Sequence, residues 1–321
     1  MIRKEFNINK INKIRKKISP YILDTPVISV ENNFGFKNKT KLFLKLEFLQ
    51  NGGSFKTRGA FNNILNLTKK NKKKGVVAVS AGNHAIAVSY ASNKLKINNK
   101  VIMFKSSNPK RRQIVKSLGS KLIIAKNLDN AFEIQEKISQ TEGKIIIHPF
   151  DGYKTLQGSA TLGLDICDKI HHLDNIIISV GGGGLIAGVS SIIKQKFPKC
   201  KVIGIEPKGA CGITKSLEAG KPLTSLKVTT IADSLGPPFH TSYSFSICQK
   251  NIDKMILISD YEMKNAMKFM AKKYNLILEP ACVAGIAALK GQLKNYINNK
   301  NNLVILCGSN IDSFSWLQFT K

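Results

Sequence analysis

Short runs of consecutive apolar residues recur along the chain, and each of them predicts a β-strand. The runs cover residues 76–80, 101–104, 122–125, 145–148, 176–180, 202–206, 255–258 and 303–307. A run that is continuously apolar, and does not alternate with polar residues, indicates a strand buried on both faces. Such strands are typical of parallel sheets covered by helices, so the pattern predicts largely parallel sheets.

Segments with the length and polarity of helices lie between these runs. We expect helices at residues 60–67, 85–94, 109–118, 131–140 and 259–274. Strands that alternate with helices predict an α/β fold. Residues 74–153 hold enough elements for a small domain, flanked in sequence by residues 1–73 and 154–321, which would form a large domain. The chain would then cross twice between the domains, and a ligand site is expected in the cleft.

The composition indicates a large core and a strong positive charge. A chain of 321 residues with 43% hydrophobic content can bury a sizeable core. The formal net charge of +30 would by itself suggest nucleic acid, an anionic membrane surface or acidic ligands. The excess is mostly lysine, however, and is spread from Lys4 to Lys321 together with Asn and Ile, which share A- and T-rich codons. Charge that is not gathered on one face releases few counterions, so nucleic-acid binding is the disfavoured alternative.

The chain also lacks the marks of a secreted or membrane protein. No segment reaches the roughly 18 consecutive apolar residues that span a membrane, and the N-terminal residues lack an apolar signal core. The 6 cysteines show no CxxC spacing, which suits reduced thiols better than disulfides or zinc ligands. We therefore expect a cytoplasmic protein with no membrane partner.

Lys56 is the first candidate for chemistry. It lies in GGSFKTRGA (residues 52–60), where two glycines break the chain before a helical segment. At a helix start, the positive end of the helix dipole, together with Arg58, should lower the pKa of this lysine. A neutral amine is what Schiff-base chemistry requires. A surface lysine after a turn is the alternative interpretation.

Two further turns each leave a predicted strand and enter a helix, where backbone N–H groups can bind an anion. The turn SAGNH (residues 80–84) suits a carboxylate, although Ser80 and Asn83 could simply cap the helix. The turn GGGG (residues 181–184) lets backbone amides approach a phosphate closely. Its spacing matches neither GxGxxG nor a Walker loop, so a single phosphate is favoured over a nucleotide. A flexible turn is the alternative.

The strand at residues 303–307 ends in CGSN (residues 307–310), at the carboxyl end where α/β sheets place ligands. Taken alone, Cys307 would be interpreted as a buried thiol. Taken together and in this order, GSFKTRGA, SAGNHA, GGGGL and CGSN resemble the fold-type II pyridoxal-phosphate enzymes, specifically the serine/threonine dehydratases (threonine ammonia-lyases) and serine racemases. The resemblance extends from Asp24 to the C-terminus and includes TIADSLG (residues 230–236) and LEPA (residues 278–281).

This resemblance implies a fold similar to the tryptophan synthase β subunit: two open, twisted, mostly parallel sheets flanked by helices, with the active site in the cleft between a large and a small domain. It implies pyridoxal 5'-phosphate as the cofactor, a small amino acid as the substrate and a homodimer. The implied reaction is α,β-elimination of water from serine or threonine, which gives pyruvate or 2-oxobutanoate and ammonia.

The resemblance also assigns roles to residues. Lys56 would be the catalytic residue, which bonds to the cofactor and acts as the base. The cofactor-binding residues would be Phe55, Lys56, Asn83, Gly181, Gly182, Gly183, Gly184, Leu185 and Cys307. The substrate-binding residues would be Ser54, Ser80, Ala81, Gly82, Asn83, His84 and Gly236. Cys307 would give the pyridine nitrogen a neutral partner, which makes the ring a weaker electron sink and favours prompt loss of the β-substituent.

Two positions depart from the family pattern. Ala81 stands where the racemases of the family carry a serine that acts as an acid, and alanine cannot transfer a proton. We therefore expect a dehydratase, with serine racemase as an alternative. The divalent metal site of some members maps to Glu206, Ala210 and Gly212, where a carboxylate is missing. We expect a weak Mg²⁺ or Ca²⁺ site, a monovalent cation or no metal, with Glu206 as a structural cap instead.

The segment SLGPPFH (residues 234–240) is expected to border the side-chain pocket, with two prolines that stiffen it. His240 would either meet an anionic substrate group, which adds 3-hydroxyaspartate dehydratase as an alternative, or lie in an exposed loop. Replacement at the β-carbon, as in cysteine synthases, is disfavoured because those enzymes carry a different lysine segment. The chain ends soon after Asn310, so we expect no C-terminal regulatory domain and no isoleucine feedback.

Overall fold

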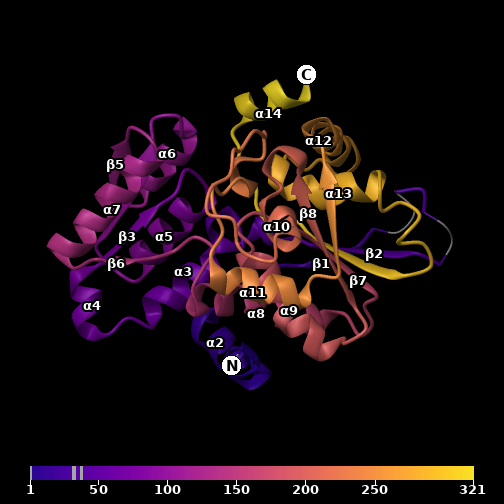
Figure 1. The fold of residues 1–321 in the computed structure, drawn as a ribbon, viewed down its shortest axis with the longest axis horizontal. Coiled ribbons are helices and arrows are strands. Elements are labelled where there is room, and N and C mark those ends of the chain that lie inside the picture. Colours follow the sequence, from indigo (N-terminus) through magenta and orange to yellow (C-terminus); the bar gives the residue numbers. More distant parts are fainter. Residues whose placement is uncertain (1, 31–33, 37–38) are drawn as a thin grey trace.

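The computed structural model describes residues 2–30, 34–36 and 39–321 and contains two separate β-sheets (Figure 1). The small sheet has the strand order β5-β4-β3-β6, and all of its pairings are parallel. The large sheet has the order β1-β2-β10-β7-β8-β9 and is parallel except for the antiparallel pair of β1 and β2. The predicted α/β fold with largely parallel sheets is therefore confirmed.

The strands of the small sheet all come from one continuous stretch of chain. They are β3 (Val76–Val79), β4 (Asn99–Phe104), β5 (Lys121–Ala125) and β6 (Ile145–Ile146). The large sheet takes strands from both sides of this stretch. They are β1 (Val27–Ser29), β2 (Lys41–Lys45), β7 (Asn175–Ser179), β8 (Lys201–Pro207), β9 (Lys254–Ile258) and β10 (Asn301–Ile305).

Helices cover both faces of the small sheet because its buried side chains alternate in direction. Val77 and Val79 pack toward α7 (Leu128–Glu142), whereas Val76 and Ala78 pack toward α5 (Asn83–Lys94) and α3 (Lys56–Leu65). Helix α3 also packs against α8 (Tyr153–Lys169), which lies with the large sheet. The helix that begins at Lys56 therefore stands between the two sheets.

The other helices complete the layers around the large sheet and the edges of the molecule. They are α1 (Ile2–Glu5), α2 (Ile8–Ile18), α4 (Lys69–Lys74), α6 (Pro109–Ser117), α9 (Gly184–Lys196), α10 (Gly212–Glu218), α11 (Ser242–Asn251), α12 (Asp260–Tyr274), α13 (Pro280–Lys290) and α14 (Ser313–Thr320). Within the part of the chain that the structure describes, no helix is both long enough and apolar enough to cross a membrane.

Some boundaries differ from the predicted ones for local reasons. Helix α7 begins three residues before the expected position 131, because the side chain of Asn127 accepts a hydrogen bond from the backbone N–H of Asn130 and caps the helix. Strand β6 ends at Ile146, not at residue 148. Beyond it, Pro149 has no N–H for the ladder, and the ring of His148 accepts a hydrogen bond from the backbone N–H of Asp151 instead.

Candidate active site

Lys56 is the first residue of α3, as predicted, and its position is fixed from two directions. The preceding Phe55 donates its backbone N–H to the carbonyl of Cys307 over 3.1 Å, which ties the start of α3 to the end of β10. The lysine Nζ donates to the carbonyl of Pro149 over 2.5 Å. Burial lowers the pKa of the Lys56 amine to about 8, while a negative charge on Cys307 would raise it. The amine is thus held inside the protein with a reduced preference for the charged form.

The expected contribution of Arg58 to this pKa is not found. Its guanidinium is fully buried and points to two carboxylates, with Nε 2.8 Å from Glu47 Oε2 and Nη1 2.7 Å from Asp165 Oδ2. Its charge is therefore compensated within the protein, and burial is the main cause of the lowered lysine pKa. Sequence reasoning missed these ion pairs because Asp165 is far away along the chain and Glu47 approaches Arg58 only in the folded protein.

The four-glycine turn links β7 to the start of α9, where the first backbone N–H groups of a helix are free to bind an anion. Gly183 has φ +84°, a conformation that favours glycine. A Cβ atom on Gly182 would lie 2.1 Å from the ring of Phe150, and one on Gly183 would lie 2.9 Å from Cys248 Sγ. Only glycine therefore fits at these two positions without a shift of the neighbouring side chains.

One cavity, which we call the cofactor cavity, brings the predicted cofactor residues together. The lining includes Phe55, Lys56, Asn83, Gly181, Gly182, Gly183, Gly184, Leu185 and Cys307. Sequence reasoning missed Ser179 and Glu279, which line the same cavity, and Ser234, expected at the side-chain pocket, lines it as well. Residues from α3, α5, the β7–α9 turn and the end of β10 thus face one space.

Glu279 organises this cavity, although the LEPA motif gave no hint of its role. The side chain is 1% exposed and accepts hydrogen bonds from Asn83 Nδ2 at 2.7 Å and from the backbone N–H of Asn310 at 3.1 Å. Arg111, from α6, places Nη2 3.5 Å from Glu279 Oε2 and donates through Nε to the carbonyl of Asn310. Burial raises the pKa of the Glu279 carboxyl, against the lowering effect of Arg111. This network fixes the amide of Asn83.

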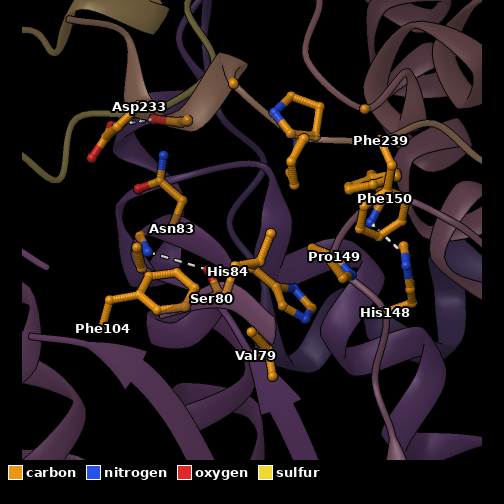
Figure 2. Close-up of a pocket in the computed structure, with 18 of the residues that line it drawn as sticks. Val79, Ser80, Asn83, His84, Phe104, His148, Pro149, Phe150, Asp233 and Phe239 are labelled. Atoms are coloured by element: carbon orange, nitrogen blue, oxygen red, sulfur yellow. Dashed lines mark hydrogen bonds between the residues drawn. The ribbon is translucent and has the colours of Figure 1, made fainter. Parts of the chain in front are cut away.

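A second cavity, which we call the substrate cavity, adjoins the first and has a volume of about 190 Å³. Six of the predicted substrate residues line it together with Lys56, namely Ser80, Ala81, Gly82, Asn83, His84 and Gly236. Figure 2 shows Ser80, Asn83 and His84 on one side of the cavity, and Phe150 and Phe239 on the other. Ser54 instead lies buried in a bridge with Gly308, and its hydroxyl has no hydrogen-bond partner among the described residues.

Both histidines of the substrate cavity are held neutral. His84 Nε2 is 2.8 Å from the carbonyl oxygen of Ile147, and burial lowers the pKa of His84 to about 3. His148 Nδ1 accepts the backbone N–H of Asp151 at 2.9 Å, so the proton of the neutral ring is on Nε2. Burial lowers the pKa of His148 to about 4. The cavity therefore contains no imidazolium at neutral pH.

His240 is not the exposed loop residue that sequence reasoning offered, nor does it line the substrate cavity. It is 4% exposed, and its ring packs against Gly212, where an added Cβ would lie 2.1 Å from Nε2. The backbone N–H of His240 donates to the carbonyl of Leu223 at 2.7 Å. The predicted contact between His240 and an anionic substrate group is therefore wrong, because the side chain turns toward α10.

Glu206 takes the structural role that was the alternative to metal binding. It accepts hydrogen bonds from the backbone N–H groups of Ile213 at 2.8 Å and Thr214 at 2.9 Å, and so caps α10. Burial raises the pKa of Glu206 to about 7, against these hydrogen bonds. Ala210 lies nearby in a single 3₁₀ turn. In the part of the chain that the structure describes, no cluster of three or more His, Cys, Asp or Glu residues could hold a metal ion. The weak Mg²⁺, Ca²⁺ or monovalent cation site stays a prediction.

The residues present fit a phosphate-bearing aldehyde such as pyridoxal phosphate. The turn before α9 offers backbone N–H groups in a cradle that any Cβ would fill. Ser179, at the end of β7, has a buried hydroxyl with no described partner, and it faces the same cavity. Lys56 and Cys307 lie in this cavity as well. The fold and site define a class of enzymes that bind an aldehyde cofactor through a buried lysine.

Comparison with known proteins identifies the family. The model of the pyridoxal-phosphate dependent enzymes matches residues 18–308, so the chain belongs to this family, and the predicted cofactor and fold type are confirmed. The chain is 39% identical over 307 residues to phenylserine dehydratase of Ralstonia pickettii, which covers 96% of this chain and 94% of the relative. It is 35% identical to the catabolic L-threonine dehydratase TdcB of Escherichia coli K12, over 88% of this chain and 86% of the relative. Maize serine racemase matches with a TM-score of 0.90 and 30% identity, over 97% and 95% of the two chains.

Proposed function

We propose that this protein eliminates water from a β-hydroxy-α-amino acid and so forms a 2-oxo acid and ammonia. The observation that carries the proposal is the buried Lys56 amine, placed between the glycine cradle and the turn at residues 80–84. The dehydratase names of two relatives and the motifs of the chain support the same reaction. Pyridoxal phosphate, when bound, supplies an electron-withdrawing ring that acidifies the α-carbon of the substrate.

Different residues of the chain bind the substrate and remove its proton. Backbone N–H groups of the turn at residues 80–84 hold the substrate carboxylate, which orients the α-hydrogen toward Lys56. Lys56, neutral above a pH of about 8, removes this proton. The bond between the β-carbon and oxygen then breaks, and the hydroxyl leaves as water together with the proton that Lys56 has taken up. The released enamine becomes an imine, and hydrolysis of the imine gives the 2-oxo acid and ammonia.

The positions of Ala81 and His240 argue against the alternative reactions. Ala81 lines the substrate cavity and has no proton to give, so the second base of a racemase is missing at this position. His240 lies outside the cavity, and both cavity histidines are neutral, so 3-hydroxyaspartate would meet no cationic imidazole. We infer that elimination is the main reaction, in a cytoplasmic enzyme that we expect to be a homodimer.

The test is a spectrum followed by product analysis. The purified protein with pyridoxal phosphate should show an absorbance band near the visible edge, and Lys56→Ala should abolish it. With β-hydroxy amino acids, wild type should release equal amounts of 2-oxo acid and ammonia, and added sulfide should not divert the product. A colourless protein that binds DNA in a salt-sensitive manner, or rapid formation of D-serine from L-serine, would overturn the proposal.

A further inference from the structure

The far end of the substrate cavity is an apolar chamber. Its walls are formed by Phe104 from β4, Leu128 and Phe132 from α7, Phe150, and the segment Pro237, Pro238 and Phe239. Figure 2 shows Phe150 and Phe239 close together, across the cavity from Ser80 and Asn83. With the substrate carboxylate at the turn of residues 80–84, the β-substituent extends into this chamber.

Three aromatic rings of the chamber contact one another and form an aromatic wall. The centroids of Phe132 and Phe239 are 5.8 Å apart at an interplanar angle of 62°, and those of Phe150 and Phe239 are 5.9 Å apart at 54°. Aromatic pairs prefer such tilted contacts at centroid distances of about 4.5–7 Å. Phe132 comes from the helix that covers the small sheet, whereas Phe239 comes from a loop beside the large sheet, so the contact closes the chamber from both sides.

The substrate cavity is large enough to admit a ring. It measures about 190 Å³ in all, from Lys56 and the turn of residues 80–84 to the chamber, and an apolar cavity of about 150 Å³ is enough to bind benzene. The methyl group of threonine would leave part of the apolar wall of the chamber without contacts, and an unfilled apolar void loses the dispersion energy of its walls. A planar ring would fill the chamber and touch several rings at once.

The polar groups around the chamber do not favour a charged substituent. His148 is neutral, and its Nδ1 already accepts the backbone N–H of Asp151. Asp233, at the edge of the cavity, is an acid that would repel a second carboxylate, although it pairs with Arg111 at 2.5 Å. A neutral aromatic substituent therefore matches the lining better than an acidic one.

We propose that the preferred substrates are β-aryl β-hydroxy amino acids of the 3-phenylserine type, and that Phe132 and Phe239 are the residues that select the ring. This inference rests on the proposed dehydratase function and specifies its substrate class. The reaction on 3-phenylserine removes the α-proton and the β-hydroxyl as water, and the water consumed in imine hydrolysis restores the balance. The products are phenylpyruvate and ammonia.

The test compares four substrates on the enzyme loaded with pyridoxal phosphate: 3-phenylserine, 3-cyclohexylserine, threonine and serine, all as the L-threo or L isomers. We expect kcat/KM for 3-phenylserine to exceed that for threonine by more than about 100-fold, since a single methylene in an apolar pocket changes it about 10- to 200-fold. The saturated ring, similar in size but without π-electrons, should be about tenfold poorer than the aromatic one. A value for threonine or 3-cyclohexylserine equal to that for 3-phenylserine would overturn the inference and leave the dehydratase function standing.

Two variants test whether Phe132 and Phe239 select the aromatic ring of the substrate. Phe132→Leu and Phe239→Leu keep most of the apolar volume, and each should lower kcat/KM for 3-phenylserine at least tenfold while changing that for threonine less than threefold. Phe314→Leu is the matched control, because Phe314 is 69% exposed on α14, and it should change neither value. Equal losses on both substrates would show that the two rings only support the fold, and would overturn their role in selection.

Binding of amino acids that cannot react tests the aryl preference separately from the dehydratase reaction. L-Phenylalanine and L-cyclohexylalanine lack a leaving group, so calorimetry on the loaded enzyme can compare them with L-alanine. L-Phenylalanine should bind at least tenfold more tightly than either, and Phe239→Leu should reduce the difference. Binding no tighter than that of L-alanine would overturn the aryl chamber by itself. Tight binding of L-phenylalanine without ammonia from any of the four substrates would instead overturn the dehydratase function.

Discussion

Replacing Glu47 with glutamine should destabilise the protein by about 3 kcal/mol, because it removes one charge from a buried ion pair. The side chains of Arg58 and Glu47 are both 0% exposed. Two hydrogen bonds of 2.8 Å join the guanidinium to both carboxylate oxygens, and the hydroxyl of Thr25 donates to the same carboxylate. Glutamine keeps the shape but leaves Arg58 with the carboxylate of Asp165 alone.

The expected value follows from the cost of an uncompensated buried charge. Removal of one partner from such a pair costs about 3–5 kcal/mol, and the retained shape and second carboxylate place this case at the lower end. If the free energy of unfolding falls by about 3 kcal/mol per molar urea, the urea concentration at the midpoint of unfolding should fall by about 1 M. Arg58 is two residues after Lys56, so the variant should also bind pyridoxal phosphate more weakly.

The pH dependence provides a second measurement of the same ion pair. Burial alone would raise the pKa of the Glu47 carboxyl, but the charges of Arg58 and Lys45 and the hydrogen bonds bring it below the usual value of 4.5. A depressed pKa contributes stability above the unfolded value and loses it as the pH falls through the folded value. The difference between wild type and Glu47→Gln should therefore be constant near neutrality and shrink below a pH of about 4.5.

Urea unfolding of the loaded enzyme, followed by fluorescence at several pH values, tests the reasoning. Asp168→Asn is the control, because Asp168 is 57% exposed in its pair with Arg15 and an exposed pair contributes about 0–1 kcal/mol. The assignment of stability to the buried pair would be refuted by either of two results. One is a loss of less than 1 kcal/mol in the free energy of unfolding of Glu47→Gln. The other is a difference in this free energy between wild type and Glu47→Gln that stays unchanged in acid.

Three other changes test the site. Gly182→Ala should weaken pyridoxal phosphate binding by at least about tenfold in equilibrium dialysis, since its Cβ would lie 2.1 Å from the Phe150 ring and overpacking costs about 1–3 kcal/mol; unchanged affinity would contradict the cradle. The rate at which the apoprotein incorporates pyridoxal phosphate, followed by absorbance, should rise with pH, reach half of its maximum at a pH of about 8 and level off above it, because half of the Lys56 amine is neutral at its pKa of about 8; a flat profile would contradict a titrating amine. Ala81→Ser should add slow conversion of L-serine to D-serine, measured by chiral chromatography, whereas wild type should show little; no gain would mean that a hydroxyl there does not reach the α-carbon.

The sequence predicted local elements well and long-range contacts poorly. The apolar runs predicted the central strands, such as β7 and β8, because these are buried along their length. Strand β2 was missed because KLFLK alternates, with Leu42 and Leu44 buried and Lys41 exposed. The fully buried Lys45 donates to the carbonyl of Thr25 at 2.6 Å, which no local pattern announces.

In the site, too, local motifs were predicted and long-range contacts were not. Motifs located the lysine and the two turns, because each is built from neighbouring residues. The network of Arg111, Glu279 and Asn83 joins positions from three helices or their ends, and only the folded chain brings them together. His240 was misplaced for a similar reason, since its burial depends on the bare backbone of Gly212.

The place of β10 in the large sheet has a consequence for the order in which the chain can fold during synthesis. β10 lies between β2 and β7, so the early strand β2 has no neighbour on that side until residues 301–305 leave the ribosome. The small sheet is complete at residue 146 and needs nothing that is translated later for its own strand pairing. The nascent chain can therefore assemble the small sheet early, while one edge of β2 stays unpaired until residues 301–305 have emerged.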